Sequence, residues 1–156
     1  MQRDEADSQF AKLLPGQPRH ALVFAEHHYL YSDDASSPAK QARAIQLIAG
    51  YQRSGLLVVS LQVLQEYFAA ATGKLGVDPE TAQRKVELLA RARVVRFVED
   101  DVIAAIEFHR LNRISFWDAM IVRAARLAGT GLLYSEDLRH GAILGGVRIE
   151  NPFLAV

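Results

Sequence analysis

Short, wholly apolar runs recur along the chain and are separated by longer segments of helical periodicity. Leu56–Val59 (LLVV) is a clear example, because it contains no polar side chain that would face solvent. Strands of this kind are buried on both faces, as in parallel sheets that are covered by helices on two sides. The sequence therefore predicts an α/β protein, a three-layer α/β/α sandwich around a central, mostly parallel sheet of four to five strands with right-handed crossovers.

Turn and capping residues set the bounds of the expected elements. Ser60 and Ser115 are expected helix N-caps, Asp78 precedes a proline suited to a first helical turn, and Gly55 and Gly129 are expected helix ends. The expected strands cover residues 21–25, 56–59, 94–98, 132–134 and 147–149, and the expected helices cover residues 38–53, 61–72, 79–92, 100–111 and 115–128.

Length and composition favour one domain with a well-developed core. The chain has 156 residues, of which 50% are apolar and 23% are charged, which excludes a disordered protein. Residues 1–20 are polar and without clear periodicity, so we expect an N-terminal extension followed by a domain over residues 21–156. Lys and Arg together equal Asp and Glu at 18 each, so nucleic-acid binding would have to use local patches.

The composition also narrows the chemistry and the compartment. The chain has no cysteine, which excludes disulfides, thiolate catalysis and cysteine-based zinc sites. No apolar run approaches the roughly 20 residues of a membrane helix, and the first residues lack the apolar region of a signal peptide. We therefore expect a soluble cytoplasmic protein without a membrane partner.

Acidic residues follow the ends of several expected strands. Glu26 follows the first strand, Glu66 lies two turns into the helix after the second, Asp118 is near the start of a later helix, and Asp137 follows the fourth strand with Glu136 before it. Ligands of open parallel sheets bind beyond the carboxyl ends of the strands. Clustered carboxylates at such an edge suit Mg²⁺ or Mn²⁺, and a site of this type suits phosphodiester hydrolysis.

Each acid also has a purely structural interpretation. Asp118 follows Ser115 by three residues, which is a helix-capping arrangement, and Glu66 fits an ordinary charge on a helix surface. Glu136 and Asp137 fit caps of a turn. His27 and His28 are metal ligands by type, but adjacent residues at the end of a strand point in opposite directions. These alternatives stay open on the residues alone.

Three stretches together resemble one protein family. LVVSLQVLQEYFAAATGK, SFWDAMIVRAARLAG and LLYSEDLRHG, with the ending GVRIENPF, are similar to PIN-domain ribonucleases, specifically VapC-type toxins of type II toxin–antitoxin pairs. The resemblance extends from about Ala21 to Phe153. It implies a PIN fold, Mg²⁺- or Mn²⁺-dependent cleavage of RNA, a VapB-like antitoxin partner and a homodimer.

The resemblance also implies roles for particular residues. The family's conserved acids fall on Glu66, Asp118 and Asp137, which are the expected catalytic residues and, with Glu26, the expected metal ligands. A bound metal would polarise the scissile phosphate and supply hydroxide. Ser135 is an expected secondary contact, and Trp117 is expected to belong to the core.

The first motif departs from the family pattern. Family members leave the first strand with an Asp-Thr-Asn-like turn, whereas this chain has Glu26, His27 and His28. Aligning on the strand places Glu26 at the Asp position, and aligning on Tyr31 places Ala25 there. Glu26 retains the charge but adds a methylene, and Mg²⁺ tolerates little distortion.

Three functional hypotheses follow from this departure. The first is an active metal-dependent endoribonuclease toxin. The second is a catalytically impaired PIN domain that still binds its antitoxin or RNA. The third is a PIN-type phosphodiesterase outside toxin–antitoxin systems.

Overall fold

The computed structural model describes residues 22–24 and 26–155, and it leaves out the side chains of residues 22–24 and 26–28. The predicted extension, residues 1–20, lies outside the described residues, so its separation from a domain over 21–156 stays a prediction. The elements follow in the order β1 (Leu22–Phe24), α2 (Glu26–Tyr31), α3 (Pro38–Ser54), β2 (Leu57–Ser60), α4 (Leu61–Gly73), α5 (Pro79–Leu89), β3 (Arg93–Val95), α6 (Glu99–Asn112), α7 (Phe116–Leu127), β4 (Leu132–Tyr134), β5 (Ile143–Leu144) and β6 (Val147–Glu150).

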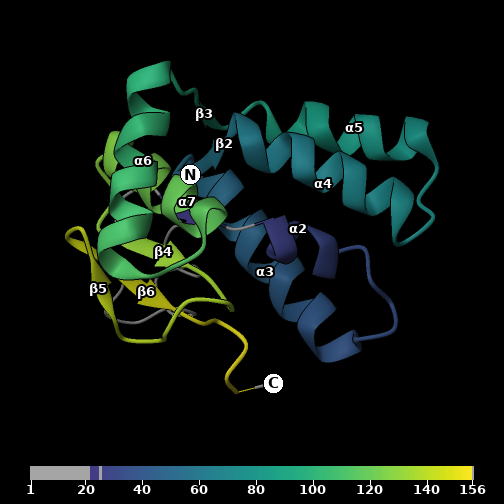
Figure 1. Ribbon diagram of the computed structural model, residues 1–156. Coiled ribbons are helices and arrows are strands. Elements are labelled where there is room, and N and C mark those ends of the chain that lie inside the picture. Colours follow the sequence, from purple (N-terminus) through teal and green to yellow (C-terminus); the bar gives the residue numbers. More distant parts are fainter. Residues whose placement is uncertain (1–21, 25, 156) are drawn as a thin grey trace.

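The described strands form one six-stranded sheet in the order β3-β2-β1-β4-β6-β5 (Figure 1). All neighbouring strands are parallel except β5, which is antiparallel to β6. In the register, Val23 of β1 lies between Val58 of β2 and Leu133 of β4. The α/β class and the mostly parallel sheet are confirmed, but the expected four to five strands omitted the short β5.

The β5 strand depends on the turn that follows it. Ile143–Leu144 joins β6 through Gly145 and Gly146, whose φ angles are 57° and 82°. Two consecutive residues with positive φ are typical of a tight hairpin turn, which glycine adopts without a steric penalty. A Cβ on Gly145 would also lie 3.1 Å from Cδ of Arg126. A two-residue strand has too little pattern of its own to be predicted from periodicity.

Successive residues of β2 and of β4 face opposite layers of the molecule. Leu57 and Val59 belong to one core cluster, while Val58 between them belongs to another. The first cluster lies under α3, α4 and α5, and the second lies under α7 with contributions from α6 (Figure 1). This alternation explains why β2 is buried at all four positions, as the apolar run predicted.

The predicted helix ends agree with the observed caps. The hydroxyl oxygens of Ser60 and Ser115 accept hydrogen bonds from the N–H groups of Val63 (3.2 Å) and Asp118 (3.0 Å). The Asp78 carboxylate accepts one from Thr81 (3.1 Å), and Gly55 ends α3 with φ of 72°. No helix in the described part of the chain has the length and apolar character needed to cross a membrane.

The six-residue helix α2 was not predicted. Its sequence, EHHYLY, has no favoured N-cap residue before it, and it is shorter than an isolated helix needs to be stable. Lys85 of α5 donates a hydrogen bond to the carbonyl oxygen of Tyr29 (3.0 Å), and Tyr29 is fully buried. Lys85 also pairs with Asp33 (2.9 Å), which follows α2. Tertiary contacts therefore hold this helix in place.

Candidate active site at the carboxyl edge of the sheet

The sheet topology brings three predicted acidic segments to one edge. β2, β1 and β4 lie side by side and run parallel, so the segments that leave them meet at their shared carboxyl edge. Glu26 begins α2 two positions after the last residue of β1, Ser60 ends β2 and caps α4, and Ser135 follows β4. The chain moves from β1 to β2 on one side and places β4 on the other. This reversal is the position where open α/β sheets bind ligands.

Asp118 reaches the same edge from α7. This helix ends at Leu127, shortly before β4 begins, so it runs back along the sheet and its first turn lies toward the carboxyl edge. Ser115 Oγ donates a hydrogen bond to Oδ2 of Asp118 (2.8 Å) and accepts one from the Asp118 N–H (3.0 Å). The capping arrangement that the sequence left open is therefore present. It also fixes the direction of the carboxylate.

Glu66 lies in the second turn of α4 and is partly buried. Its Oε1 accepts a hydrogen bond from Nε2 of Gln62, 2.8 Å away and one turn earlier. Gln62 is itself buried, so this hydrogen bond lies partly away from solvent. Glu66 is thus a partly buried carboxylate with a fixed neighbour, not a fully solvated surface charge.

Asp137 and Ser135 lie in the segment after β4. Asp137 is exposed, whereas Ser135 is buried and its hydroxyl accepts a hydrogen bond from the Leu138 N–H (3.2 Å). The Ser135 N–H donates to the carbonyl oxygen of Glu150 on β6 (2.9 Å). Ser135 therefore shapes the turn that carries Asp137.

Glu136 has partners that the sequence analysis missed. Tyr31 donates a hydrogen bond to Oε2 of Glu136 (2.6 Å), and Lys40 forms an ion pair with Oε1. Because Tyr31 and Lys40 are 105 and 96 residues away along the chain, no local pattern signals these contacts.

The expectation that Trp117 belongs to the core was wrong. The side chain is 58% exposed, and its ring lies 5.1 Å from that of Phe116 in a tilted arrangement. The next residues of α7, Ala119, Met120 and Ile121, are buried. Position 117 is in the first turn of α7, one turn before Met120 and Ile121, and its side chain stays largely exposed at this end of the helix.

The predicted acids are of the residue type that binds Mg²⁺ or Mn²⁺. The described side chains do not form a complete metal site. Carboxylate oxygens are the ligands that Mg²⁺ and Mn²⁺ prefer. No group of three or more acidic or histidine side chains in the described part of the chain is placed to hold a metal ion. The fourth predicted ligand, Glu26, has its backbone at the start of α2, but its side chain lies outside the described residues, as do those of His27 and His28.

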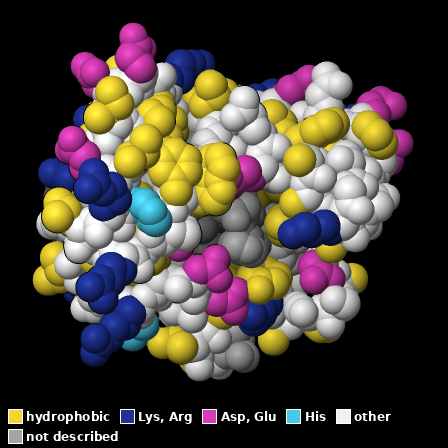
Figure 2. All heavy atoms as spheres, in the orientation of Figure 1, with side chains coloured by type: hydrophobic (Ala, Val, Ile, Leu, Met, Phe, Trp, Pro, Cys, Tyr) yellow, Lys and Arg dark blue, Asp and Glu magenta, His cyan; other side chains and the backbone are white. Residues whose placement is uncertain are grey.

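The surface around this edge is chemically mixed. Acidic side chains gather near the middle of the face seen in Figure 2, with a group of apolar side chains above them and basic side chains both next to them and further out. Trp117 is among the exposed large apolar residues, and so are Ile103, Ile106 and Leu111 of α6. The edge therefore combines negative charge with exposed apolar surface.

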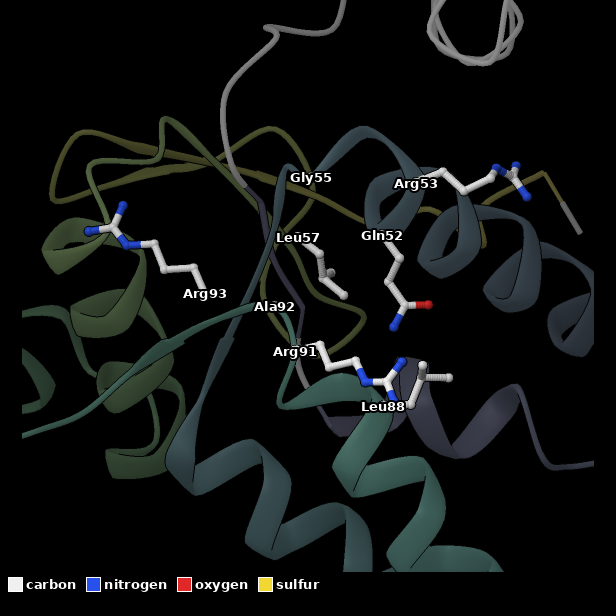
Figure 3. Close-up of a pocket in the computed structure, with 8 residues that line it drawn as sticks. All are labelled: Gln52, Arg53, Gly55, Leu57, Leu88, Arg91, Ala92 and Arg93. Atoms are coloured by element: carbon white, nitrogen blue, oxygen red, sulfur yellow. The ribbon is translucent and has the colours of Figure 1, made fainter. Parts of the chain in front are cut away.

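A cavity of about 330 Å³ lies at the opposite edge of the sheet (Figure 3). It borders the start of β2 and β3, and none of the described residues that line it is acidic. In Figure 3 the side chains of Arg53 and Arg93 point to opposite sides, away from the cavity, while Arg91 lies beside Leu88. The cavity is thus separate from the acidic edge. Its lining residues are Gln52, Arg53, Gly55, Leu57, Leu88, Arg91, Ala92 and Arg93.

Comparison with known proteins identifies the family. The model of the PIN domain matches residues 21–143, so this chain belongs to the PIN domain family. No curated protein matches the chain.

Three solved structures share the fold. A toxin–antitoxin complex from Klebsiella pneumoniae has a TM-score of 0.65 at 15% identity and covers 85% of this chain and 98% of its own. DNA-bound VapBC from Salmonella typhimurium has a TM-score of 0.59 at 19% identity, with coverage of 85% and 98%. VapC20 of Mycobacterium tuberculosis, a toxin that cleaves the sarcin–ricin loop, has a TM-score of 0.57 at 19% identity, with coverage of 72% and 87%.

Proposed function

We propose that this protein is a metal-dependent endoribonuclease toxin of a VapBC-type toxin–antitoxin pair, hydrolysing RNA phosphodiester bonds. The observation that carries the proposal is the convergence of acidic segments at the carboxyl edge of β2, β1 and β4 in a PIN fold. The structural likeness to toxin–antitoxin complexes and to a toxin that cleaves the sarcin–ricin loop supports the same class.

In this proposal Glu66, Asp118 and Asp137 are the catalytic carboxylates, and with Glu26 they would hold Mg²⁺ or Mn²⁺. A bound metal supplies charge neutralisation at the scissile phosphate and a hydroxide nucleophile at neutral pH. Gln62 orients the Glu66 carboxylate, and Ser115 orients that of Asp118. Fixing these groups before the RNA arrives reduces the reorganisation needed at the reacting phosphate.

The altered first motif favours a second candidate function. Glu26 is one methylene longer than the Asp of the family pattern, and it begins a helix whose next residues are His27 and His28. A PIN domain with a displaced ligand at this position would bind its partner or RNA without efficient cleavage. The two candidates predict the same fold and partner and differ in turnover.

The proposed partner is an antitoxin that covers the acidic edge, and the proposed assembly is a homodimer. A cationic side chain of the antitoxin, Arg or Lys, would pair with Glu66 or Asp118, because charge-assisted hydrogen bonds between cations and carboxylates are among the strong ones. Binding of the adjacent gene's product to purified protein would test this contact. An antitoxin that binds but leaves both the Glu66 and the Asp118 carboxylates accessible to chemical modification would contradict the proposed contact.

Cleavage of single-stranded RNA by the purified protein tests the proposal. We expect cleavage with Mn²⁺, none with EDTA, and a loss of at least about 100-fold in Asp118→Asn, which corresponds to roughly 2.7 kcal/mol in the barrier. The matched control is Asp100→Asn, which changes an exposed acid in the first turn of α6 and should leave cleavage unchanged.

Two outcomes would contradict parts of the proposal. Equal cleavage by the wild type and Asp118→Asn would exclude the acidic edge as the active site. Mn²⁺ binding without cleavage would support the impaired-domain candidate instead. The melting temperature of Asp118→Asn should change little, because relief of repulsion from the other acids of the site offsets the loss of a favourable charge in the first turn of α7.

A further inference from the structure

A contact between four distant segments lies beside the proposed site. Tyr31 is the last residue of α2, Lys40 lies in the first turn of α3, Glu136 follows β4, and Phe153 is near the C-terminus. Tyr31 donates a hydrogen bond to Oε2 of Glu136 (2.6 Å), and Lys40 pairs with Oε1. The Lys40 ammonium also lies 3.3 Å from the Tyr31 hydroxyl. We call these four residues the clamp.

Aromatic rings shield the charges of the clamp from water. The Lys40 ammonium lies 4.6 Å from the centroid of the Tyr31 ring and 5.6 Å from that of Phe153. The two rings meet edge to face with centroids 5.1 Å apart, and Phe153 is almost fully buried. The Lys40 and Glu136 side chains are 30% and 25% exposed. This ion pair is therefore better shielded than an ordinary surface pair.

The protonation states support a stable contact. The hydrogen bond to Glu136 raises the pKa of Lys40, so the ammonium stays charged at neutral pH. Burial, followed by the hydrogen bond to Glu136, raises the pKa of Tyr31, so its phenol stays neutral and donates. The carboxylate of Glu136 thus accepts from an ammonium on one oxygen and from a phenol on the other.

We propose that the clamp positions the first and last acidic segments of the proposed active site, with Lys40 as the positioning residue. Tyr31 closes the short helix that begins with Glu26, and Glu136 directly precedes Asp137. A helix of six residues is only about 9 Å long, so holding its last residue holds its first. This inference rests on the proposed function, because it assigns a role in the same site.

The clamp residues are directed at one another, as expected for a structural role and not for binding a metal ion or RNA. Glu136 directs its two oxygens to groups of the protein, which favours a structural role over ligation. Lys40 directs its ammonium to Glu136 and to the two rings, so it is not directed at a phosphate. Loss of Lys40 should therefore lower the turnover rate rather than weaken RNA binding.

The test compares Lys40→Met and Tyr31→Phe with the wild type, with Lys40→Arg as the conservative rescue. Lys74→Met, which changes an exposed lysine after α4, is the matched control. Tyr31→Phe removes the hydroxyl but keeps the ring, so it tests the clamp even where Lys40→Met folds poorly. The readouts are kcat and KM for RNA cleavage and amide hydrogen exchange at residues 27–31 and 136–138.

We expect Lys40→Met to lower kcat about tenfold with KM changed by less than about twofold, and Tyr31→Phe to lower kcat about threefold. Exchange in both segments should become at least about fivefold faster in both variants. Lys40→Arg should restore most of the rate, and Lys74→Met should change neither readout.

A rise in KM with unchanged kcat would overturn the inference, because it would place Lys40 on the RNA. Unchanged exchange in both segments would overturn it as well. Failure of the proposed function is separate, because it appears as absent cleavage by the wild type. The exchange readout then still decides whether the clamp holds the two segments.

Discussion

The two edges of the sheet carry opposite charges. At the carboxyl edge, Asp118 lies in the first turn of α7 and Asp137 follows β4. Glu66 lies in the second turn of α4, the helix that follows β2. At the amino edge, Arg53 lies in the last turn of α3 and Arg93 begins β3, both beside the cavity. The central strands β2 and β4 are short and largely apolar, so most of these charges lie in helix turns and loops, and Arg93 lies at one end of a strand.

Helix electrostatics account for the amino edge. Arg53 and Arg126 lie in the last turns of α3 and α7, where a positive charge stabilises the carbonyl end of a helix. Arg93 donates a hydrogen bond to the carbonyl oxygen of Ala128, at the C-terminus of α7 (2.9 Å). Each of these arginines either lies at the C-terminal end of a helix or donates a hydrogen bond to one. The positive charge of the amino edge is therefore explained without a bound ligand.

The same rule accounts for only part of the carboxyl edge. Asp118 lies in the first turn of α7, where a negative charge is favourable. Glu66 lies in the second turn of α4, whose first turn contains no acid. Asp137 is in no helix. Helix capping therefore explains only one of these three carboxylates. Carboxylates without such a role are expected at a functional site.

Asp101 shows what a purely structural acid looks like in this protein, and its removal should have the largest effect on stability. It accepts hydrogen bonds from the Val98 N–H (3.0 Å) and from Nε (2.9 Å) and Nη2 (2.6 Å) of Arg123. We expect Asp101→Asn to lower the free energy of unfolding by about 2 kcal/mol, because the charged partner of Arg123 is lost. RNA cleavage by the folded variant should not change.

The pH dependence of this effect has a definite sign. The hydrogen bond from Val98, followed by that from Arg123, lowers the pKa of Asp101. Its contribution is therefore complete above the ordinary Asp pKa of about 3.9 and is lost as pH falls through the lowered value. Urea unfolding at pH 7 and at decreasing acidic pH should show the wild type and Asp101→Asn converging. A constant difference across this range would contradict the assignment.

Restoring the family pattern at the first motif should have the next largest effect. We expect the triple variant Glu26→Asp, His27→Thr and His28→Asn to raise Mn²⁺-dependent cleavage at least tenfold, about 1.4 kcal/mol in the barrier, because it removes the extra methylene from the ligand. The initial rate on single-stranded RNA measures this. No gain in the triple variant, together with loss of parental activity in Glu26→Ala, would show that Glu26 is a working ligand.

The amino edge should show the smallest effect. Arg93→Gln should lower the free energy of unfolding by about 0.5–1 kcal/mol, because the hydrogen bond to the end of α7 is weakened. Thermal unfolding measures the loss, and cleavage of RNA should stay within about twofold of the wild type. A large loss of cleavage in a variant of unchanged stability would show that both edges take part in function.

The sequence was most informative where the structure is locally determined. The apolar runs marked β2 and β4 because both faces of these strands are buried, and Ser60, Ser115 and Gly55 marked helix ends because capping involves neighbouring residues. These apolar runs and capping residues also predicted alternating strands and helices, and hence a parallel sheet. The parallel sheet in turn predicted the edge at which the acidic segments lie. Their roles as ligands stay predictions.

The short helix α2, the strand β5 and the clamp were decided by the tertiary structure. α2 is held by Lys85 from α5, and β5 exists through its pairing with β6. The contacts of Glu136 with Tyr31 and Lys40 join segments about a hundred residues apart. Hydrophobic periodicity and capping are properties of neighbouring residues, so the sequence by itself determined the elements and their class. Which distant charges meet depends on strand order and helix packing, and only the folded chain brings those groups within hydrogen-bonding distance.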